Sequence, residues 1–234
     1  MDYNDLLELV KNRRSHRRFK ADPIPDGTVE KVLELARLVP SAGNAQPWEF
    51  IIVEDAAVKK NISKNIMQIF GKAEKLDTTL YPAAVQSHMF MAPVLIVVCA
   101  DPRLKVTYPA FLNRDLLFYQ SLAICEYAIQ LAAACFGLAT AWATIQDDAA
   151  EAEVKKLLDI PAIYVVDHII PLGYPDDKME ARNKRLAPIL KRAPYRRKLT
   201  EIIHYGKYNR SKLKSDKEVS QFITRRTVTR IPRT

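Results

Sequence analysis

A long apolar segment near the middle of the chain constrains the fold more than any other feature. From Leu116 to Phe136 almost every residue is apolar or small. Such a segment predicts a helix over 113–136 that is buried on all sides and ends at Gly137. A second apolar run, 94–98, predicts a central strand that is covered on both faces. The chain is therefore expected to fold around a layered core.

The flanking segments alternate between helical and extended patterns. Apolar residues at one-face spacing predict a helix capped by Asn4 or Asp5, a second helix capped by Thr28, and further helices over 56–70 and 149–158. Strands are expected over 48–53, 138–144 and 163–172. We find no internal repeat, so these elements predict one α+β domain with a three-layer core.

Glycine spacing excludes two common nucleotide-binding motifs. The chain has six glycines, and no two of them lie within twelve positions of each other. A dinucleotide-binding turn and a phosphate loop of the Walker type both need closely spaced glycines. A nucleotide cofactor would have to be held by a different kind of site.

The cysteines and histidines indicate neither a disulfide framework nor a structural metal site. Three cysteines and four histidines form no C-x-x-C and no H-E-x-x-H. The odd number of cysteines fits buried thiols in a reducing compartment, and Cys125 and Cys135 are expected to pack in the long helix. The acidic N-terminus is unlike a signal peptide, and the longest apolar run, 92–100, is about half of a membrane span. These features predict a cytoplasmic protein that does not cross a membrane.

The positive charge is concentrated towards the C-terminus. Residues 1–177 carry 18 Lys/Arg against 23 Asp/Glu, whereas residues 178–234 carry 18 against 4. The basic segment could be a nucleic-acid arm, an arm that wraps an acidic partner subunit, or a set of phosphate ligands. No aromatic and basic recognition module accompanies it, so nucleic acid is the least favoured of these partners.

Four short motifs carry side chains suited to binding. Arg13-Arg14-Ser15-x-Arg17 offers guanidinium groups and a hydroxyl to a phosphate, or is a solvated helix end. The segment 40–48 places a hydroxyl and two amides between two prolines, which suits a polar uncharged ligand edge. The third motif, 142–145, has small residues in a strand, and the fourth, 182–186, is a second cationic cluster. No nucleophile motif is present, so an enzyme of this sequence would depend on a cofactor.

Taken in order, the four motifs resemble the FMN-dependent nitroreductase family. The resemblance extends over about residues 4–190 and is most specific in the first two motifs. It implies an α+β, three-layer fold with a mixed, mostly antiparallel sheet flanked by helices. It also implies an intertwined homodimer with two FMN molecules at the interface. The FMN-binding domain would span 1–194, and a basic extension, 195–234, would wrap the partner subunit.

The resemblance assigns roles to the motifs. The first motif and the second cationic cluster would hold the FMN phosphate. The proline-bracketed loop would meet the ribityl chain and the flavin edge, in this family often from the other subunit, and the backbone of 143–145 would face the ring. The residues implied to bind FMN are Arg13, Arg14, Ser15, Arg17, Pro40, Ser41, Ala42, Asn44, Gln46, Ala143, Thr144, Ile145, Lys184 and Arg185.

The implied chemistry is ping-pong hydride transfer without a metal. NAD(P)H would reduce FMN, and a nitroaromatic, a quinone or a similar flat electrophile would then take the electrons. Aromatic residues that could stack on this substrate, or simply pack, are Tyr81, His88, Phe90, Tyr108 and Phe111. Two alternatives stay open: a specialised flavin reaction, such as reductive dehalogenation or flavin fragmentation, and a nucleic-acid or protein-binding module that uses the basic tail.

Overall fold

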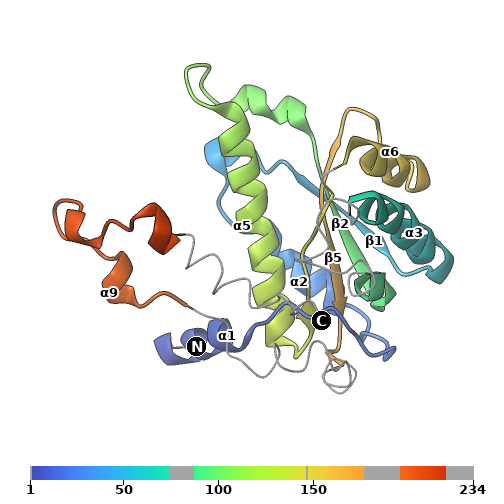
Figure 1. Cartoon of the computed structure of the whole chain (residues 1–234). Coiled ribbons are helices and arrows are strands. Elements are labelled where there is room, and N and C mark those ends of the chain that lie inside the picture. Colours follow the sequence, from blue (N-terminus) through green and yellow to red (C-terminus); the bar gives the residue numbers. More distant parts are fainter. Residues whose placement is uncertain (1, 74–86, 146, 177–195, 220–234) are drawn as a thin grey trace.

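A sheet covered by helices on both faces forms the body of the protein (Figure 1). The computed structural model describes residues 2–73, 87–145, 147–176 and 196–219. Their helices are α1 (Tyr3–Asn12), α2 (Thr28–Arg37), α3 (Ala56–Ala73), α5 (Arg114–Cys135), α6 (Asp148–Leu157) and α9 (Leu199–Ile202). The strands are β1 (Trp48–Val53), β2 (Val94–Ala100), β3 (Ala139–Thr140), β4 (Ala143–Thr144) and β5 (Val165–Gly173). Short 3-10 turns occupy Ala42–Asn44, Ser87–Met91, Pro102–Thr107 and Arg210–Lys212.

The strands pair in the order β1-β2-β5-β3, and β4 also pairs with β5. Each of these pairs is antiparallel. All seven residues of β2 are buried, which confirms the predicted central strand. The mostly antiparallel sheet expected from the resemblance is also confirmed.

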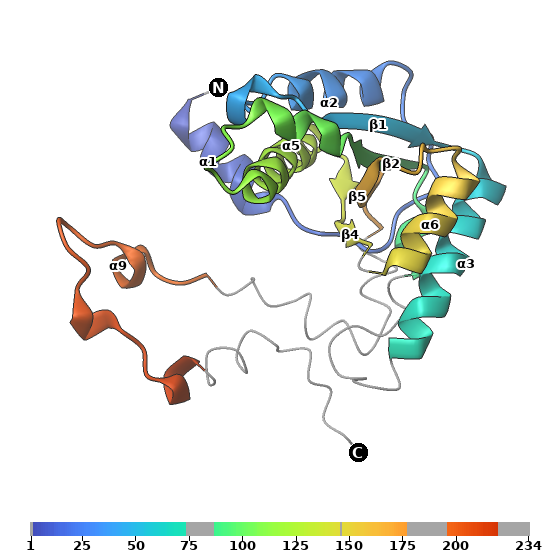
Figure 2. The same cartoon turned by 90° about the horizontal axis from the view of Figure 1, so that it is seen from above.

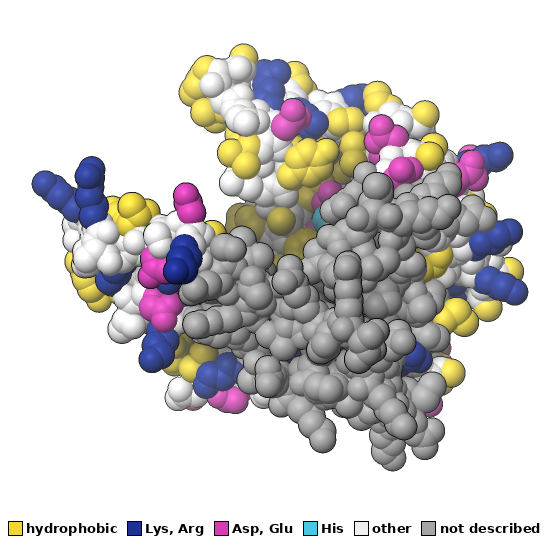
Figure 3. All heavy atoms as spheres, viewed as in Figure 1, with side chains coloured by type: hydrophobic (Ala, Val, Ile, Leu, Met, Phe, Trp, Pro, Cys, Tyr) yellow, Lys and Arg dark blue, Asp and Glu magenta, His cyan; other side chains and the backbone are white. Residues whose placement is uncertain are grey.

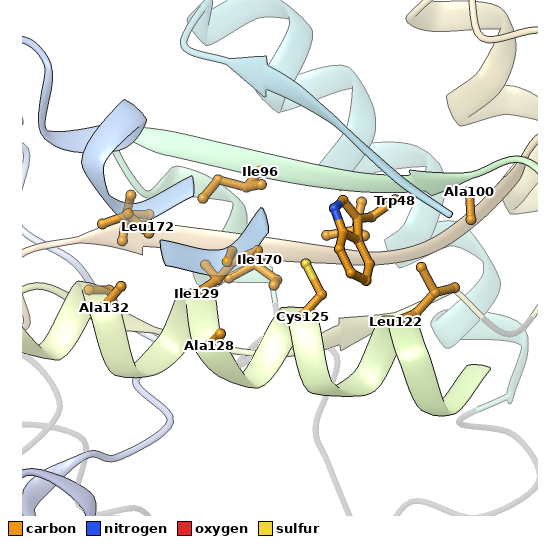
Figure 4. Close-up of a cluster of buried hydrophobic side chains, with 14 of the residues drawn as sticks. Trp48, Ile96, Ala100, Leu122, Cys125, Ala128, Ile129, Ala132, Ile170 and Leu172 are labelled. Atoms are coloured by element: carbon orange, nitrogen blue, oxygen red, sulfur yellow. The ribbon is translucent and has the colours of Figure 1, made fainter. Parts of the chain in front are cut away.

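Alternate residues of β2 serve two separate cores. Ile96, Val98 and Ala100 pack with α2 and α5, whereas Leu95, Val97 and Cys99 face α3 and α6. Figure 4 shows Trp48, Ile96, Leu122, Cys125 and Ile129 meeting between the sheet and α5. Seen from above, α2 and α5 lie on one side of the strands and α3 and α6 on the other (Figure 2). The three-layer arrangement is thus confirmed.

The ends of several elements differ from the sequence prediction. Asp2, not Asn4 or Asp5, caps α1, because its carboxylate accepts hydrogen bonds from the backbone N–H groups of Asn4 and Asp5. Helix α2 begins at Thr28, so its cap is Gly27. The strand predicted over 138–144 is split into β3 and β4, which both pair with β5.

Helix α5 forms as predicted, but the prediction that it is buried on all sides is wrong for the single chain. Asn113 caps its start, and Gly137, at φ +68°, ends it with the 6→1 and 5→2 hydrogen bonds of a Schellman motif. Ten of its residues are buried. Cys135 is exposed, contrary to the expectation that it packs. The large apolar side chains of α5 that are exposed are Leu116, Tyr119, Ile124 and Tyr127.

The exposed apolar side of α5 is part of a larger surface. In Figure 3, hydrophobic side chains gather over the upper part of α5 and the segment that leads into it. By length and composition α5 could cross a membrane. However, 56% of its apolar 18-residue stretch is buried inside the domain, as in the core helix of a folded protein. The described helices include no other of that kind.

A bulge interrupts β5 beside α5. Val98 pairs with His168, but Cys99 pairs with Val166, so Asp167 has no partner on β2. An extra residue of this kind breaks the strict alternation of side chains between the two faces. Asp167 and His168 can therefore approach the same neighbours, although they are adjacent in sequence.

Residues 196–219 form an arm that carries α9. It stands away from the sheet in both cartoon views (Figures 1 and 2). Several of its apolar side chains are exposed, among them Leu199, Tyr205 and Leu213. The predicted domain boundary at 194/195 lies outside the described residues.

Candidate functional site

The arginine-rich motif follows α1 and meets the C-terminal half of α5. Arg13 Nη1 donates to Gln130 Oε1 over 3.2 Å. Gln130 is buried, and its Nε2 has no partner among the described residues. Ser15 forms a parallel bridge with Thr140 of β3, and the next N–H, that of His16, donates to the Thr140 carbonyl over 2.9 Å. The motif is thereby tied to the edge of the sheet.

The three arginines of the motif do not behave alike. Arg14 turns back and donates to the carbonyls of Lys11 and Arg13, where a cation also stabilises the helix end. Arg13 and Arg17 are half-buried. Arg13 and Arg17, rather than Arg14, are therefore the better candidates to hold an anion.

The proline-bracketed loop is organised by its own polar groups. Ser41 Oγ accepts from the Gln46 N–H over 3.0 Å, and Gln46 Nε2 donates to Asn44 Oδ1 over 3.2 Å. The Ala42 N–H donates to Ser121 Oγ over 3.1 Å, which anchors the loop to the N-terminal half of α5. Pro40 and Asn44 are exposed.

In one chain the loop and the arginine motif are held at different places along α5. Their anchors, Ser121 and Gln130, are nine residues apart, which is about 14 Å of helix. The two motifs therefore lie beside different halves of α5 in one chain.

Strand β4 continues the wall that begins at the arginine motif. Ala143 is buried opposite Ile169, and Thr144 lies exposed opposite His168. Thr140 pairs with Leu172 on the same strand, four residues from His168, or about 13 Å. Ile145 is half-buried against the α3/α6 core. Residues 13–17 thus lie beside β3, and Thr144 lies further along β5 on the α5 side of the sheet, whereas Ala143 and Ile145 face the α3/α6 core.

Three ionisable residues that the sequence analysis did not single out meet beside Thr144. His168 Nδ1 lies 3.0 Å from Glu126 Oε1 and 3.2 Å from Asp167 Oδ2. His168 Nε2 lies 2.9 Å from Thr144 Oγ1, and its ring packs edge-on against Trp142. Glu126 is fully buried. The sequence signals for this cluster were a charged residue, Glu126, within an apolar helix and the Asp167-His168 pair within an apolar strand.

Glu126, Asp167 and His168 form an ion-pair cluster. Their ligand atoms lie within 4.8 Å of one another, a spacing that would also suit a metal ion. Nδ1 faces both carboxylates, so one proton on Nδ1 is shared between Glu126 Oε1 and Asp167 Oδ2, whereas the buried Glu126 Oε2 has no partner among the described residues.

The cluster shifts the pKa values of its members. Burial raises the pKa of Glu126 to about 7, and its hydrogen bond to His168 only partly offsets this. Burial also opposes the charge on His168, but the hydrogen bonds to Asp167 and Glu126 outweigh it and raise the pKa of His168 to about 9. Between these values both partners are ionised.

The raised pKa of His168 predicts a loss of stability at alkaline pH. The free energy by which protonated His168 stabilises the fold is fully present below pH 6.5, which is the pKa of histidine in the unfolded chain. It is lost as the pH rises to about 9, the pKa of His168 in the folded protein. The free energy of unfolding in urea should fall by on the order of 2–3 kcal/mol over this range. The raised pKa of Glu126 acts in the same direction at lower pH, between 4.5 and about 7. In His168→Gln the part of the fall that belongs to the imidazolium is lost, so the fall between pH 6.5 and 9 should be smaller, and an equal fall in both proteins would contradict the assignment.

The aromatic residues predicted to line a substrate pocket are scattered. Phe90 is buried in the α3/α6 core and Tyr108 in the α2/α5 core, on opposite faces of the sheet. These two side chains pack, which is one of the alternatives that the sequence left open. Phe111 is 87% exposed. Tyr81, the side chain of His88, Lys184 and Arg185 lie outside the described residues.

Comparison with known proteins places this architecture in a family. The sequence model of the nitroreductase family matches residues 10–174. The chain belongs to the nitroreductase family. A relative from Archaeoglobus fulgidus, named as an NADH dehydrogenase/NAD(P)H nitroreductase, is 34% identical and aligns over 75% of this chain and 88% of its own length. The 5,6-dimethylbenzimidazole synthase of Rhodospirillum rubrum is 27% identical over 75% of this chain and 85% of that protein.

Solved structures of the nitroreductase family have the same fold. An oxidised iodotyrosine deiodinase, bound to FMN and 3-iodo-L-tyrosine, aligns with a TM-score of 0.58 at 28% identity and covers 74% of this chain and 90% of its own. An FMN-dependent nitroreductase from Clostridium difficile aligns with a TM-score of 0.62 over 86% of this chain and 99% of its own. At 23% identity, the latter likeness concerns the fold alone.

Proposed function

We propose that this protein is an FMN-dependent oxidoreductase that takes hydride from NAD(P)H and passes the electrons to a nitroaromatic, a quinone or a similar flat electrophile. The observation that carries the proposal is the wall from Arg13 and Ser15, which are bridged to Thr140 of β3, to the exposed Thr144 of β4, because β3 and β4 pair with the same strand β5. It places cationic and hydroxyl donors at one end and the Thr144 hydroxyl at the other. Membership of the nitroreductase family supports the same reading.

The residues of this wall fit FMN. Gln130 Nε2 is a buried donor without a partner among the described residues, and it belongs to the amide that holds Arg13. A buried donor of this kind favours an acceptor, and a phosphate supplies several. At the other end, the exposed Thr144 offers the surface of β4 to a flat ring.

A second chain would complete the site. The arginine wall and the proline-bracketed loop are about 14 Å apart along α5 of one chain. If two α5 helices pack antiparallel about a twofold axis, the Ser121 half of one helix lies beside the Gln130 half of the other. The exposed apolar residues of α5, and Leu6 and Val10 of α1, would be buried by this contact. We therefore propose a homodimer with two FMN sites at its interface.

In this reading the protein provides binding and position. FMN, when bound, supplies the two-electron redox chemistry. Arg13, Ser15 and Arg17 hold the phosphate, and Gln130 orients Arg13. Ser41, Asn44 and Gln46 of the partner chain offer hydroxyl and amide groups to the ribityl chain and the ring edge.

The proposed function predicts that the purified protein is yellow and that NADH or NADPH bleaches it anaerobically. The reduced protein is then mixed in a stopped-flow instrument with a nitrofuran, with menadione or with iodotyrosine. The absorbance of oxidised flavin should return fastest with the preferred substrate. Dithionite reduction is the control that separates a wrong electron donor from a wrong acceptor. A colourless protein that added FMN does not reconstitute would contradict the proposal.

Two relatives favour a specialised reaction as the second candidate. The dimethylbenzimidazole synthase noted above and an iodotyrosine deiodinase from Thermotoga neapolitana, 28% identical over 74% of this chain and 89% of its own, both align over most of their length. Release of iodide from iodotyrosine, or aerobic breakdown of reduced flavin, would favour this candidate over a nitro or quinone substrate.

The C-terminal arm is proposed to bind the partner subunit rather than nucleic acid. Its exposed apolar residues Leu199, Tyr205 and Leu213 need a surface, and the acidic body offers a complementary charge. We also propose a cytoplasmic location, because the long apolar helix α5 packs within the core.

A further inference from the structure

The ion-pair cluster contacts a hydroxyl group on the proposed cofactor wall. His168 Nδ1 lies between the Glu126 and Asp167 carboxylates, and its Nε2 meets Thr144 Oγ1 over 2.9 Å. Thr144 is exposed, whereas the His168 side chain is only 14% exposed. The histidine is therefore a buried support behind a surface hydroxyl.

The protonation state of His168 decides what Thr144 offers to a ligand. As an imidazolium, His168 donates from both ring nitrogens, so Thr144 Oγ1 accepts and its own hydrogen is free to point outward. As a neutral ring that keeps its proton on Nδ1, His168 accepts at Nε2, and the Thr144 hydrogen turns inward. The same hydroxyl is a donor to the site in the first state and only an acceptor in the second.

The surroundings of the cluster favour the first state. The groups that face His168 are the carboxylates of Glu126 on α5 and Asp167 on β5, the Thr144 hydroxyl on β4 and the Trp142 ring. Next to Glu126, burial raises the pKa of the Cys125 thiol to about 12, so this thiol stays neutral. The bulge at Asp167 allows both carboxylates to meet one ring nitrogen.

We propose that His168 is a positioning residue, held as an imidazolium by Glu126 and Asp167, that keeps the Thr144 hydroxyl directed as a donor towards the bound flavin and thereby stabilises reduced FMN over oxidised FMN. The proposal rests on the proposed function. Hydride transfer from NAD(P)H oxidises the nicotinamide and adds two electrons and one proton to FMN. The reduced ring then carries a negative charge unless it takes a second proton from solvent. An outward O–H donor backed by a buried positive charge stabilises this anionic ring.

The midpoint potential of the bound flavin tests the proposal. Equilibration with a reference dye near pH 7 should show about tenfold weaker stabilisation of reduced FMN in His168→Gln, which is a potential about 30 mV lower for two electrons. Thr144→Val should show the same loss, and the double variant should lose no more than either, because the two residues act in series. Arg37→Gln, which removes an exposed charge on α2, should leave the potential unchanged.

A measurement that does not need the flavin tests the cluster itself. NMR titration of the His168 ring should show a pKa well above the ordinary value in the wild type and a lower one in Glu126→Gln. An ordinary pKa in the wild type would overturn the proposal. So would an unchanged potential in His168→Gln or in Thr144→Val when FMN is bound. A protein that binds no FMN would instead refute the proposed function, and the NMR titration would still decide whether the cluster holds an imidazolium.

Discussion

Replacing Arg13 and Arg17 together with alanine is expected to weaken FMN binding at least a hundredfold. Each charge-assisted hydrogen bond to a phosphate in a partly buried site contributes roughly 1.5–3 kcal/mol, so the loss of two should cost about 3 kcal/mol or more. Both side chains are half-buried, and Arg13 is fixed by Gln130. Fluorescence titration of the apoprotein with FMN measures the loss directly.

A matched double variant separates a specific contact from a change in net charge. Arg37 on α2 and Lys156 on α6 are exposed and belong to neither binding motif. Arg37→Ala with Lys156→Ala removes the same charge, and FMN affinity should stay within about twofold of the wild type. If the Arg13 and Arg17 double variant retains stoichiometric FMN through gel filtration, these arginines do not hold the phosphate.

The sequence was most informative where local pattern and tertiary environment agree. The apolar run at 94–98 predicted the buried central strand, because a strand covered on both faces has no polar side. The apolar segment at 113–136 predicted the position of α5 but not its exposure. Composition does not distinguish a side chain that packs within its own domain from one, such as Ile124, that the single chain leaves exposed.

The sequence pattern did not predict short strands or irregular features of the fold. Strands β3 and β4 have two residues each, too few for an alternating signal, so they merged into one predicted strand. Glu126 and His168 are 42 positions apart, and the bulge that brings Asp167 to the same ring nitrogen has no local signature. The motifs at 13–17 and 40–48 were found as polar segments, but their anchoring to Gln130 and Ser121 depends on long-range contacts.

The sequence predicted the two binding motifs of the candidate site separately, but it did not predict how they are placed relative to each other. Residue type indicated phosphate binding at one motif and amide or hydroxyl contacts at the other. The described chain holds them on different halves of α5, so their relation depends on how a second chain packs. Assembly is accordingly the feature on which the cofactor site depends most.

Substitution of Ile124 by aspartate is expected to abolish both the dimer and FMN binding. Ile124 is 46% exposed in the single chain and lies on the same side of α5 as Tyr127. In a twofold interface each substitution appears twice, so two carboxylates would be buried without partners, at a cost of several kcal/mol. Sedimentation velocity should give the mass of one 26.7 kDa chain. The same preparation should bind FMN at least a hundredfold more weakly, because the partner's loop is then missing from the site.

The control for this experiment is Ile163→Asp. Ile163 is 51% exposed and lies in the turn before β5, away from α5, so its substitution should leave both the sedimentation coefficient and the FMN content unchanged. Circular dichroism of both variants shows whether the fold is retained. An Ile124→Asp protein that still sediments as a dimer would place the interface elsewhere. A folded monomer that binds FMN as tightly as the wild type would show that one chain alone forms the site, and the antiparallel pairing of α5 would have to be abandoned.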